Sequence, residues 1–105
     1  MKIKLENKEI KLEKAFTFYK SLMGFMFKKN ISYALIFKTS SIHTFFMKES
    51  IDVIQTDKNY NVIRIFKNLK KNKIILPKRN IYYTIELPKN TIKNIKKGDK
   101  LTIIS

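Results

Sequence analysis

Hydrophobic and polar residues alternate along much of this chain, which is the pattern of half-buried β-strands. The alternation is clearest at residues 81–87, where isoleucine, tyrosine, isoleucine and leucine occupy every second position. Shorter alternations at residues 2–5 and 8–12 predict two short strands or a hairpin. An unbroken apolar run at residues 33–37 predicts a strand that is buried on both faces. The same reasoning predicts further strands at residues 42–48, 51–56, 60–69 and 101–104.

Residues 14–27 follow a different period. Phe16, Tyr19 and Met23 recur at the three- and four-residue spacing of one helical face. Few polar positions interrupt this stretch, so we predict a mostly buried helix whose apolar face packs against the sheet. A short helical turn is predicted between residues 88 and 98, which begin with proline and end with glycine.

The chain has only two glycines and two prolines, and it shows no flexible linker and no repeat. We therefore predict a single domain over residues 1–105. Six to eight strands with one substantial and one minimal helix define a mainly β fold class. The predicted architecture is a small barrel or jelly-roll-like sandwich with one N-terminal helix and one short C-terminal helical turn.

Composition excludes several classes of function. The chain contains no cysteine, which removes disulfide scaffolds, thiolate catalysis and every cysteine-containing metal site. Residues 1–6 alternate charged and apolar side chains and do not have the apolar core of a signal peptide. The apolar runs are far shorter than the roughly 20 residues that a membrane span needs. We therefore expect a soluble, cytoplasmic protein without a membrane span.

The net charge is +15, from 23 lysines and arginines against eight acids. Such a field attracts polyanions or acidic proteins. Residues 58–85 contain no acid and have Tyr60, Phe66 and Tyr82 among their cations, as a single-stranded nucleic-acid platform would. A solvated edge strand, or a compositional bias towards lysine, explains the same pattern. The candidate polyanion contacts are Arg64, Lys67, Lys70, Lys71, Lys73, Lys78 and Arg79.

Four residues within or beside the predicted strands are candidates for a binding site: His43, Lys48, Asp52 and Glu86. His43 is the only histidine, and one histidine without cysteine cannot form a typical zinc site. No serine lies in a nucleophile motif, so we assign no catalytic residue, metal or cofactor. Two carboxylates facing one cavity would permit acid–base chemistry. Alternatively, Asp52 and Glu86 pair with Lys48 or cap a turn.

Four segments resemble the signatures of a known family. Residues 24–28, Gly-Phe-Met-Phe-Lys, resemble a Gly-Leu-Met-Phe-Arg signature. Residues 43–48, His-Thr-Phe-Phe-Met-Lys, resemble a His-Ser-Phe-Trp-Met-Lys block. Residues 51–57 are similar to a Leu-Asp-Ile-x-Phe-x-Asp strand, and residues 83–99 to a Val-Leu-Glu-Leu-Pro…Gly-Asp ending. Over about residues 15–104 the chain thus resembles the uncharacterised bacterial and archaeal domain-of-unknown-function 192 family.

The chain departs from that family's pattern in two places. The link between its Met-Lys block and the next strand is short, with only residues 49–51 remaining. Phe46 stands at the usual tryptophan position, and the polar Gln55 stands where an aromatic residue is common. These departures predict that a pocket in this region is altered or lost. The resemblance implies a small mainly β fold of barrel or jelly-roll type, and it implies no reaction, cofactor or partner.

Three hypotheses for function follow, all with an unidentified partner and oligomeric state. The leading hypothesis is a small non-enzymatic binding or accessory domain, because phosphate loops, metal sets and catalytic triads are missing from the sequence. The second is weak polyanion or nucleic-acid binding, without sequence preference, through residues 58–85. The third is a small-ligand pocket, because methionine and phenylalanine side chains adapt to apolar ligands, although they more often form core. The group in question comprises Met23, Met26, Met47, Phe25, Phe27, Phe45 and Phe46.

Overall fold

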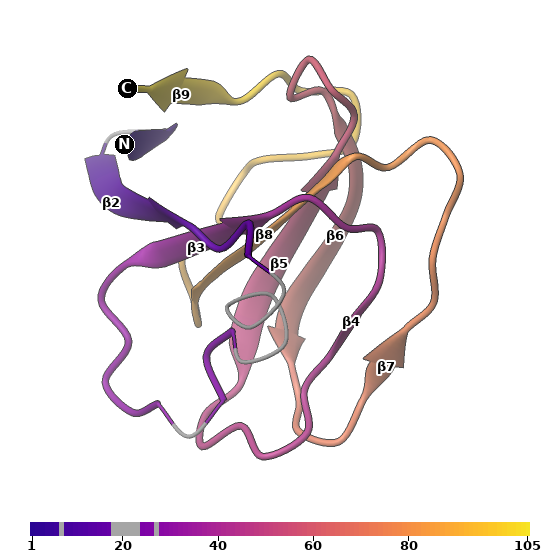
Figure 1. The fold of residues 1–105 in the computed structure, drawn as a ribbon. Helices are drawn as coiled ribbons and strands as arrows, with labels where there is room; N and C mark the ends of the chain where they lie inside the picture. The colour runs from indigo at the N-terminus through magenta and orange to yellow at the C-terminus, as the bar shows by residue number, and fades with distance from the viewer. Residues whose placement is uncertain (7, 18–23, 27) are drawn as a thin grey trace.

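The fold consists of short strands joined by turns (Figure 1). In this computed structural model, the residues described are 1–6, 8–17, 24–26 and 28–105. The strands found among them are β1 (Lys2–Leu5), β2 (Lys8–Lys14), β3 (Ala34–Phe37), β4 (Ile42–His43), β5 (Ile51–Thr56), β6 (Val62–Leu69), β7 (Ile74–Ile75), β8 (Tyr83–Pro88) and β9 (Thr102–Ile104).

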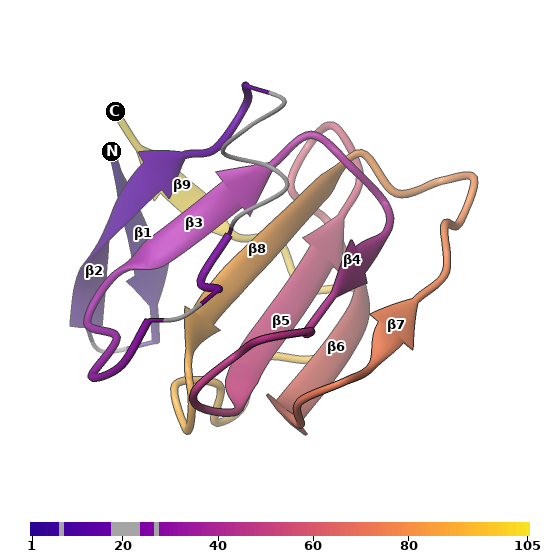
Figure 2. The same cartoon turned by 60° about the horizontal axis from the view of Figure 1, so that its bottom comes forward.

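Seven of these strands form one sheet in the order β6-β5-β8-β3-β2-β1-β9, and β4 pairs with β7 in a separate ribbon. All neighbours are antiparallel except β2 and β3, which are parallel. Figure 2 shows the sheet running from β2 through β3, β8 and β5 to β6, with the β4–β7 ribbon beside its β5–β6 end. Strand β8 therefore lies between β5 and β3, away from both edges of the sheet.

The sheet curls so far that the segment just before β9 reaches the start of β6. Beside β6, the Val62 N–H donates to the Asp99 carbonyl at 2.8 Å, and the Leu101 N–H donates to the Tyr60 carbonyl at 2.9 Å. Strands β1 and β9 pair, so the two ends of the chain lie close together (Figure 1). The result is a single mainly β domain built on a half-barrel, as the sequence predicted in outline.

The two faces of the curled sheet carry separate apolar clusters, because successive side chains of a strand point to opposite faces. The inner face is filled by a cluster that includes Leu12, Ile36, Ile54, Ile85, Leu87 and Leu101. The outer face carries a second cluster that includes Phe25, Leu35, Phe37, Met47, Ile51 and Val53. Glu86 lies opposite Leu35 on one side and Val53 on the other, so its side chain belongs to the outer face.

Most of the predicted strands are present. The strands predicted at residues 2–5, 8–12, 33–37 and 51–56 correspond to β1, β2, β3 and β5. The strand predicted at residues 42–48 is wrong beyond His43, because the chain turns there and Phe46 adopts a φ of 63°. Strand β7 was not predicted.

The described part of the chain contains no helix, although two helical segments are predicted from the sequence. The C-terminal helical turn is wrong. Asn90 has a φ of 63°, and the Thr91 and Ile92 N–H groups donate to Asp52 rather than to helical carbonyls. Correspondingly, no helix of the described residues is long and apolar enough to cross a membrane.

Half of the predicted N-terminal helix, namely residues 18–23 and 27, lies outside the residues that the structure describes. At its start, Lys14 is the last residue of β2, and at its end residues 24–26 form a turn. Of its predicted face, Tyr19 and Met23 are outside the described residues. Phe16 packs against the inner cluster and stacks on Tyr83, with ring centroids 6.5 Å apart.

Candidate functional site

A cavity of about 600 Å³ lies between the outer face of the sheet and the β4–β7 ribbon. Its described walls come from the turn at residues 24–26, the segment at residues 39–47, the segment at residues 74–77, and β8. Most of these side chains are apolar, among them Phe25, Met26, Phe45, Met47, Ile75 and Leu76. Part of the methionine–phenylalanine group therefore lines a cavity, and part of it, such as Phe25 and Met47, is also core.

Glu86 projects from β8 into this apolar wall. Its side chain is buried, and its Oε1 atom has no hydrogen-bond partner in the described part of the chain. Burial raises the pKa of the Glu86 carboxyl to about 8, although a hydrogen bond from the Phe25 N–H acts in the opposite direction. At neutral pH this carboxyl is therefore mainly a neutral acid, able to donate a hydrogen bond into the cavity.

Gly24 allows the turn at residues 24–26 to lie directly on this carboxyl. A Cβ atom at Gly24 would lie 3.1 Å from Glu86 Oε1, and the glycine has a φ of 49°. Both the contact and the left-handed backbone disfavour any other residue. The close approach keeps the Glu86 carboxyl shielded from solvent.

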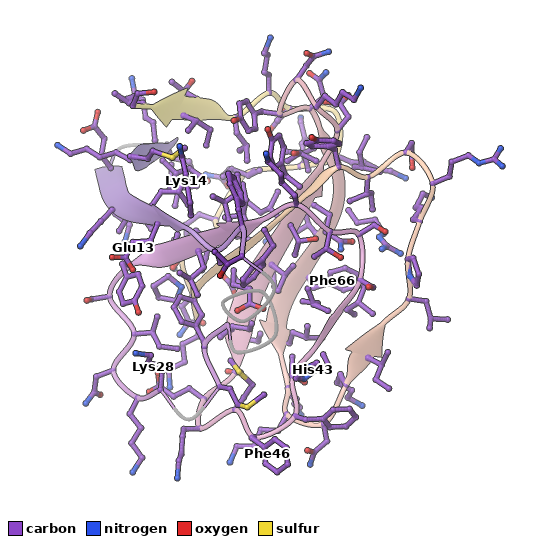
Figure 3. The ribbon with its side chains drawn as sticks, in the orientation of Figure 1. Glu13, Lys14, Lys28, His43, Phe46 and Phe66 are labelled. Carbon is purple, nitrogen blue, oxygen red and sulfur yellow. The ribbon has the colours of Figure 1, made fainter. Side chains whose placement is uncertain are left out.

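His43 lines the same cavity from β4. Its Nδ1 atom accepts a hydrogen bond from the Phe45 N–H at 3.2 Å, and the two rings stack with centroids 5.3 Å apart. In the neutral ring this assigns the proton to Nε2. Figure 3 shows His43 beside β4, with Phe46 at the same end of the molecule. The described residues contain no cluster of three or more histidine, cysteine, aspartate or glutamate side chains suited to a metal ion.

The other polar side chains on this face are satisfied by one another. Gln55 Nε2 donates to Thr84 Oγ1 at 3.0 Å, and Thr84 Oγ1 donates to the Thr39 carbonyl at 2.6 Å. Arg64 Nε donates to Gln55 Oε1 at 2.7 Å, and Arg64 Nη2 donates to the Leu76 carbonyl at 3.0 Å. Arg64, predicted as a polyanion contact, is therefore engaged in holding the segment after β7 against the sheet.

Asp52 is a structural clamp on three backbone N–H groups. Its Oδ1 atom accepts from the Asn68 N–H at 2.9 Å. Its Oδ2 atom accepts from the Thr91 and Ile92 N–H groups, each at 2.9 Å. One buried carboxylate therefore holds the end of β6 and the turn after β8 beside the start of β5.

Asp52 and Glu86 do not share a cavity. Asp52 lies opposite Leu87, whereas Glu86 lies opposite Val53, so the two carboxyl groups point to opposite faces of the sheet. Lys48 is exposed and is not among the residues that line the cavity. The structure thus brings His43 and Glu86 together and separates Lys48 and Asp52 from them.

The remaining candidate polyanion contacts lie on exposed turns and one strand. Lys67 Nζ donates to the Lys93 carbonyl at 3.2 Å. The other side chains are exposed on the turn after β6 and on the segment before β8, namely Lys70, Lys71, Lys73, Lys78 and Arg79.

Thr44 fixes the first of these turns beside the cavity. Its hydroxyl donates to the Lys70 carbonyl at 2.7 Å and accepts from the Lys73 N–H at 2.8 Å. Its own N–H donates to the Lys73 carbonyl at 2.9 Å. The lysine-rich turn after β6 is therefore held rigidly against the β4 segment.

Several site residues were not predicted from the sequence. Thr39 and Ser41 line the cavity without belonging to any motif. The apolar run at residues 74–77, Ile-Ile-Leu-Pro, did carry a signal, because it interrupts the basic stretch at residues 58–85. Gly24 belongs to the Gly-Phe-Met-Phe-Lys segment at residues 24–28, but the sequence does not indicate that it contacts Glu86.

The chain is thus a small, mainly β protein in which the β4–β7 ribbon lies over the outer face of a curled sheet, with a cavity between them. The chain belongs to the DUF192 family, described as Uncharacterized ACR, whose model matches residues 1–103. The match includes β1 and β2, which precede the region from about residue 15 onward that resembles the family's signatures. The family is uncharacterised, and no specific activity follows from membership.

The chain is also similar to archaeal proteins named UPF0127. It is 43% identical over 94 residues to one from Pyrococcus horikoshii, covering 81% of this chain and 80% of the relative. It is 37% identical over 101 residues to one from Thermococcus kodakarensis, covering 88% of this chain. There the chain spans 64% of the length of the relative.

Two crystal structures share the fold at low sequence identity. One is a protein of unknown function from Novosphingobium aromaticivorans, with a TM-score of 0.80 and 16% identity over 97% of this chain and 82% of the other. The second is titled a putative transcription regulator from Sinorhizobium meliloti, with a TM-score of 0.81 and 16% identity over 96% of this chain and 89% of the other. At this identity the similarity establishes the fold alone.

Proposed function

We propose that this protein is a small non-enzymatic binding domain whose ligand is a small, mainly apolar molecule held in the cavity beneath the β4–β7 ribbon. The observation that carries the proposal is the cavity itself, about 600 Å³ in volume, with Glu86 as a buried polar group in its wall. Ligand sites in proteins are typically apolar concavities of this size with a few placed polar groups. A cytoplasmic location, expected from the sequence, is part of the proposal.

The surroundings of the cavity support a ligand entering from solvent. Phe45, Ile74 and Leu76 line it and are nevertheless exposed, by 37%, 60% and 71% of their surfaces. Exposed large apolar side chains around a concavity mark a binding site more often than isolated ones do. Met26 and Met47 provide thioethers that adapt to the shape of a ligand.

Filling the cavity is expected to weaken the binding of a neutral apolar dye. Ser41 lines the cavity and bonds Thr39 through its backbone N–H and carbonyl groups, so Ser41→Phe keeps those contacts and places a ring in the open space. N-phenyl-1-naphthylamine is uncharged at pH 7, and its fluorescence rises in apolar surroundings, so a titration reports cavity binding without attraction to lysines. We expect saturable binding to the wild type and at least about a tenfold weaker Kd in the variant, or ~1.4 kcal/mol.

Ser32→Phe is the matched control, because Ser32 is exposed and is not a lining residue. It should bind the dye as the wild type does. Equal dye binding by Ser41→Phe and the wild type, with both variants folded, would contradict the proposed site.

A second candidate function is weak polyanion binding. It is favoured because acidic side chains bond backbone N–H groups instead of neutralising the lysines. Asp52, Asp57 and Asp99 accept hydrogen bonds from backbone N–H groups. Among the described residues, only Glu9 and Glu13 lie within 4.0 Å of a lysine ammonium group. Most of the positive charge therefore faces solvent without a neighbouring carboxylate.

Replacing Lys70, Lys71 and Lys73 with glutamine tests this second function. Fluorescence anisotropy with a labelled single-stranded oligonucleotide should show weak binding that falls steeply with salt. The slope of log K against log salt should decrease by about 0.7 for each lost phosphate contact. Thermal stability should change little, because exposed lysines contribute little to folding. The same slope change in a control that replaces the exposed Lys4, Lys8 and Lys29 would indicate net charge rather than a local surface.

A further inference from the structure

We propose that Glu86 acts as a neutral hydrogen-bond donor that recognises a carbonyl oxygen on an apolar ligand inside the cavity. The inference rests on the proposed function, and it names the chemical class of the ligand: a small uncharged molecule with an apolar body and one ketone, ester or amide oxygen. The polar end would lie against Glu86, and the body against Phe25, Met26 and Met47.

The Oε1 atom of Glu86 is unsatisfied in the described part of the chain. A buried polar atom without a partner costs about 1–3 kcal/mol, and native proteins retain few of them. Glu86 Oε1 has no partner among the described residues, although its carboxyl group is buried. The carboxyl also lines the cavity, so a molecule that occupies the cavity can provide the missing partner.

The neighbouring polar side chains on the same face have their partners within the protein. Thr84 lies two residues before Glu86 on β8, and its hydroxyl both accepts from Gln55 and donates to the Thr39 carbonyl. Gln55 Oε1 in turn accepts a hydrogen bond from Arg64 Nε. The outer face therefore provides partners for its other buried polar side chains, and Glu86 is left facing the cavity.

The unpartnered oxygen also favours one position for the proton. The Phe25 N–H acts on the carboxyl as a hydrogen-bond donor, so one of the two oxygens has to serve as an acceptor. We place the acidic hydrogen on Oε1, because that atom has no partner among the described residues. With a pKa of about 8, roughly ten molecules are protonated for each ionised one at pH 7. A ligand must then offer an acceptor to Oε1.

The surroundings favour an uncharged ligand over a cation. Among the described residues that line the cavity, His43 is the only titratable group besides Glu86. Among the described residues, the pKa of the Glu86 carboxyl is affected by burial and by the Phe25 N–H, and not by a neighbouring charge. The net charge of +15 also disfavours the approach of a cation.

Three probes of similar size and shape separate the ligand classes. Acetophenone has a neutral carbonyl, isopropylbenzene replaces it with apolar carbon, and 1-phenylethylamine is an ammonium ion at neutral pH. The ε-methyl carbon and proton signals of methionine report binding, because Met26 and Met47 line the cavity and Met1 does not. Titrations at pH 6 and pH 9 lie on either side of the Glu86 pKa of about 8.

In the wild type we expect acetophenone to bind about two- to tenfold more tightly than isopropylbenzene at pH 6, the range given by one neutral hydrogen bond. That preference should disappear at pH 9, where the ionised carboxylate repels a carbonyl oxygen. In Glu86→Gln the preference should persist at pH 9, because the amide donates at every pH. In Glu86→Leu the two compounds should bind equally at both values.

Two results would overturn the inference while leaving the cavity as a binding site. One is equal binding of acetophenone and isopropylbenzene to the wild type at pH 6, which would mean that water satisfies Oε1. The other is preferred binding of 1-phenylethylamine that strengthens towards pH 9, which would make Glu86 an anionic site for amines. If no probe shifts the Met26 or Met47 signals in any variant, the proposed function itself fails.

Discussion

Replacing Asp52 with asparagine is expected to lower the free energy of unfolding by about 2–4 kcal/mol, because it breaks a buried clamp on which three backbone N–H groups converge. Asp52 Oδ1 accepts from the Asn68 N–H, and Oδ2 accepts from the Thr91 and Ile92 N–H groups. Asparagine keeps one acceptor oxygen and turns the other position into an NH₂ group. At least one backbone N–H then faces another donor, whichever way the amide is oriented. Urea denaturation of wild type and variant at pH 7 measures the difference.

Asp57→Asn is the matched comparison for this prediction. Asp57 also accepts from backbone N–H groups, those of Asn59 at 2.8 Å and Asn61 at 3.0 Å, but it is only half-buried, in a turn at the surface. Solvent can replace those contacts, so the loss of stability should be clearly smaller than for Asp52→Asn. Equal losses at the two positions would mean that burial does not set the strength of the Asp52 clamp.

The sequence was a good guide to strands whose pattern is local. The alternation at residues 81–87 predicted β8, and the apolar run at residues 33–37 predicted a strand buried on both faces, as β3 is. These patterns depend only on side chains two residues apart, which every strand places on one face. The predicted mainly β class follows from them.

The same reasoning could not show what covers each face. In β8, Thr84 and Glu86 occupy the polar positions of the alternation, yet both are buried. The covering segments are distant in sequence, for example Gly24 over Glu86 and the Thr39 carbonyl over Thr84. A period-two pattern identifies a polar face, but it does not reveal whether another part of the chain lies on that face.

The candidate site was predicted in part for the same reason. His43 and Glu86 were both selected, and the structure places them in one cavity. Asp52 was selected with them because it is an acid in a buried strand. Its separation from Glu86 depends on the register between β5 and β8, where Asp52 meets Leu87 rather than Glu86. Register is a property of the paired strands and cannot be read from either strand alone.

The helix prediction at residues 88–98 failed through competition for hydrogen bonds. Proline at the start and glycine near the end are common helix boundaries. Here the Thr91 hydroxyl donates to the Pro88 carbonyl at 2.5 Å, and the N–H groups of Thr91 and Ile92 donate to Asp52. A buried carboxylate is a stronger acceptor than a peptide carbonyl, so the local helical pattern is overridden by a contact 39 residues away.

Glu86→Gln is expected to make the stability of the protein less dependent on pH and to stabilise it at alkaline pH. The pKa of the Glu86 carboxyl is about 8 in the folded protein and 4.5 when it is unperturbed. Between these values the folded protein holds a proton that the unfolded chain releases. Stability therefore falls as pH rises through this window, by about 1.4 kcal/mol per pH unit from this group, and stays low above pH 8.

Glutamine has the shape of the neutral acid and no proton to lose, so the variant lacks that loss of stability. Wild type and variant should unfold with similar free energies near pH 4, and the variant should be more stable by roughly 5 kcal/mol at pH 9. Glu13→Gln, on the exposed side of β2 beside Lys11, should leave the pH dependence nearly unchanged. Urea denaturation of the three proteins at several pH values between 4 and 9 provides the measurement. Parallel curves for wild type and Glu86→Gln would show that the Glu86 carboxyl is ionised in the folded protein, and the cavity would then present an anion to its ligand.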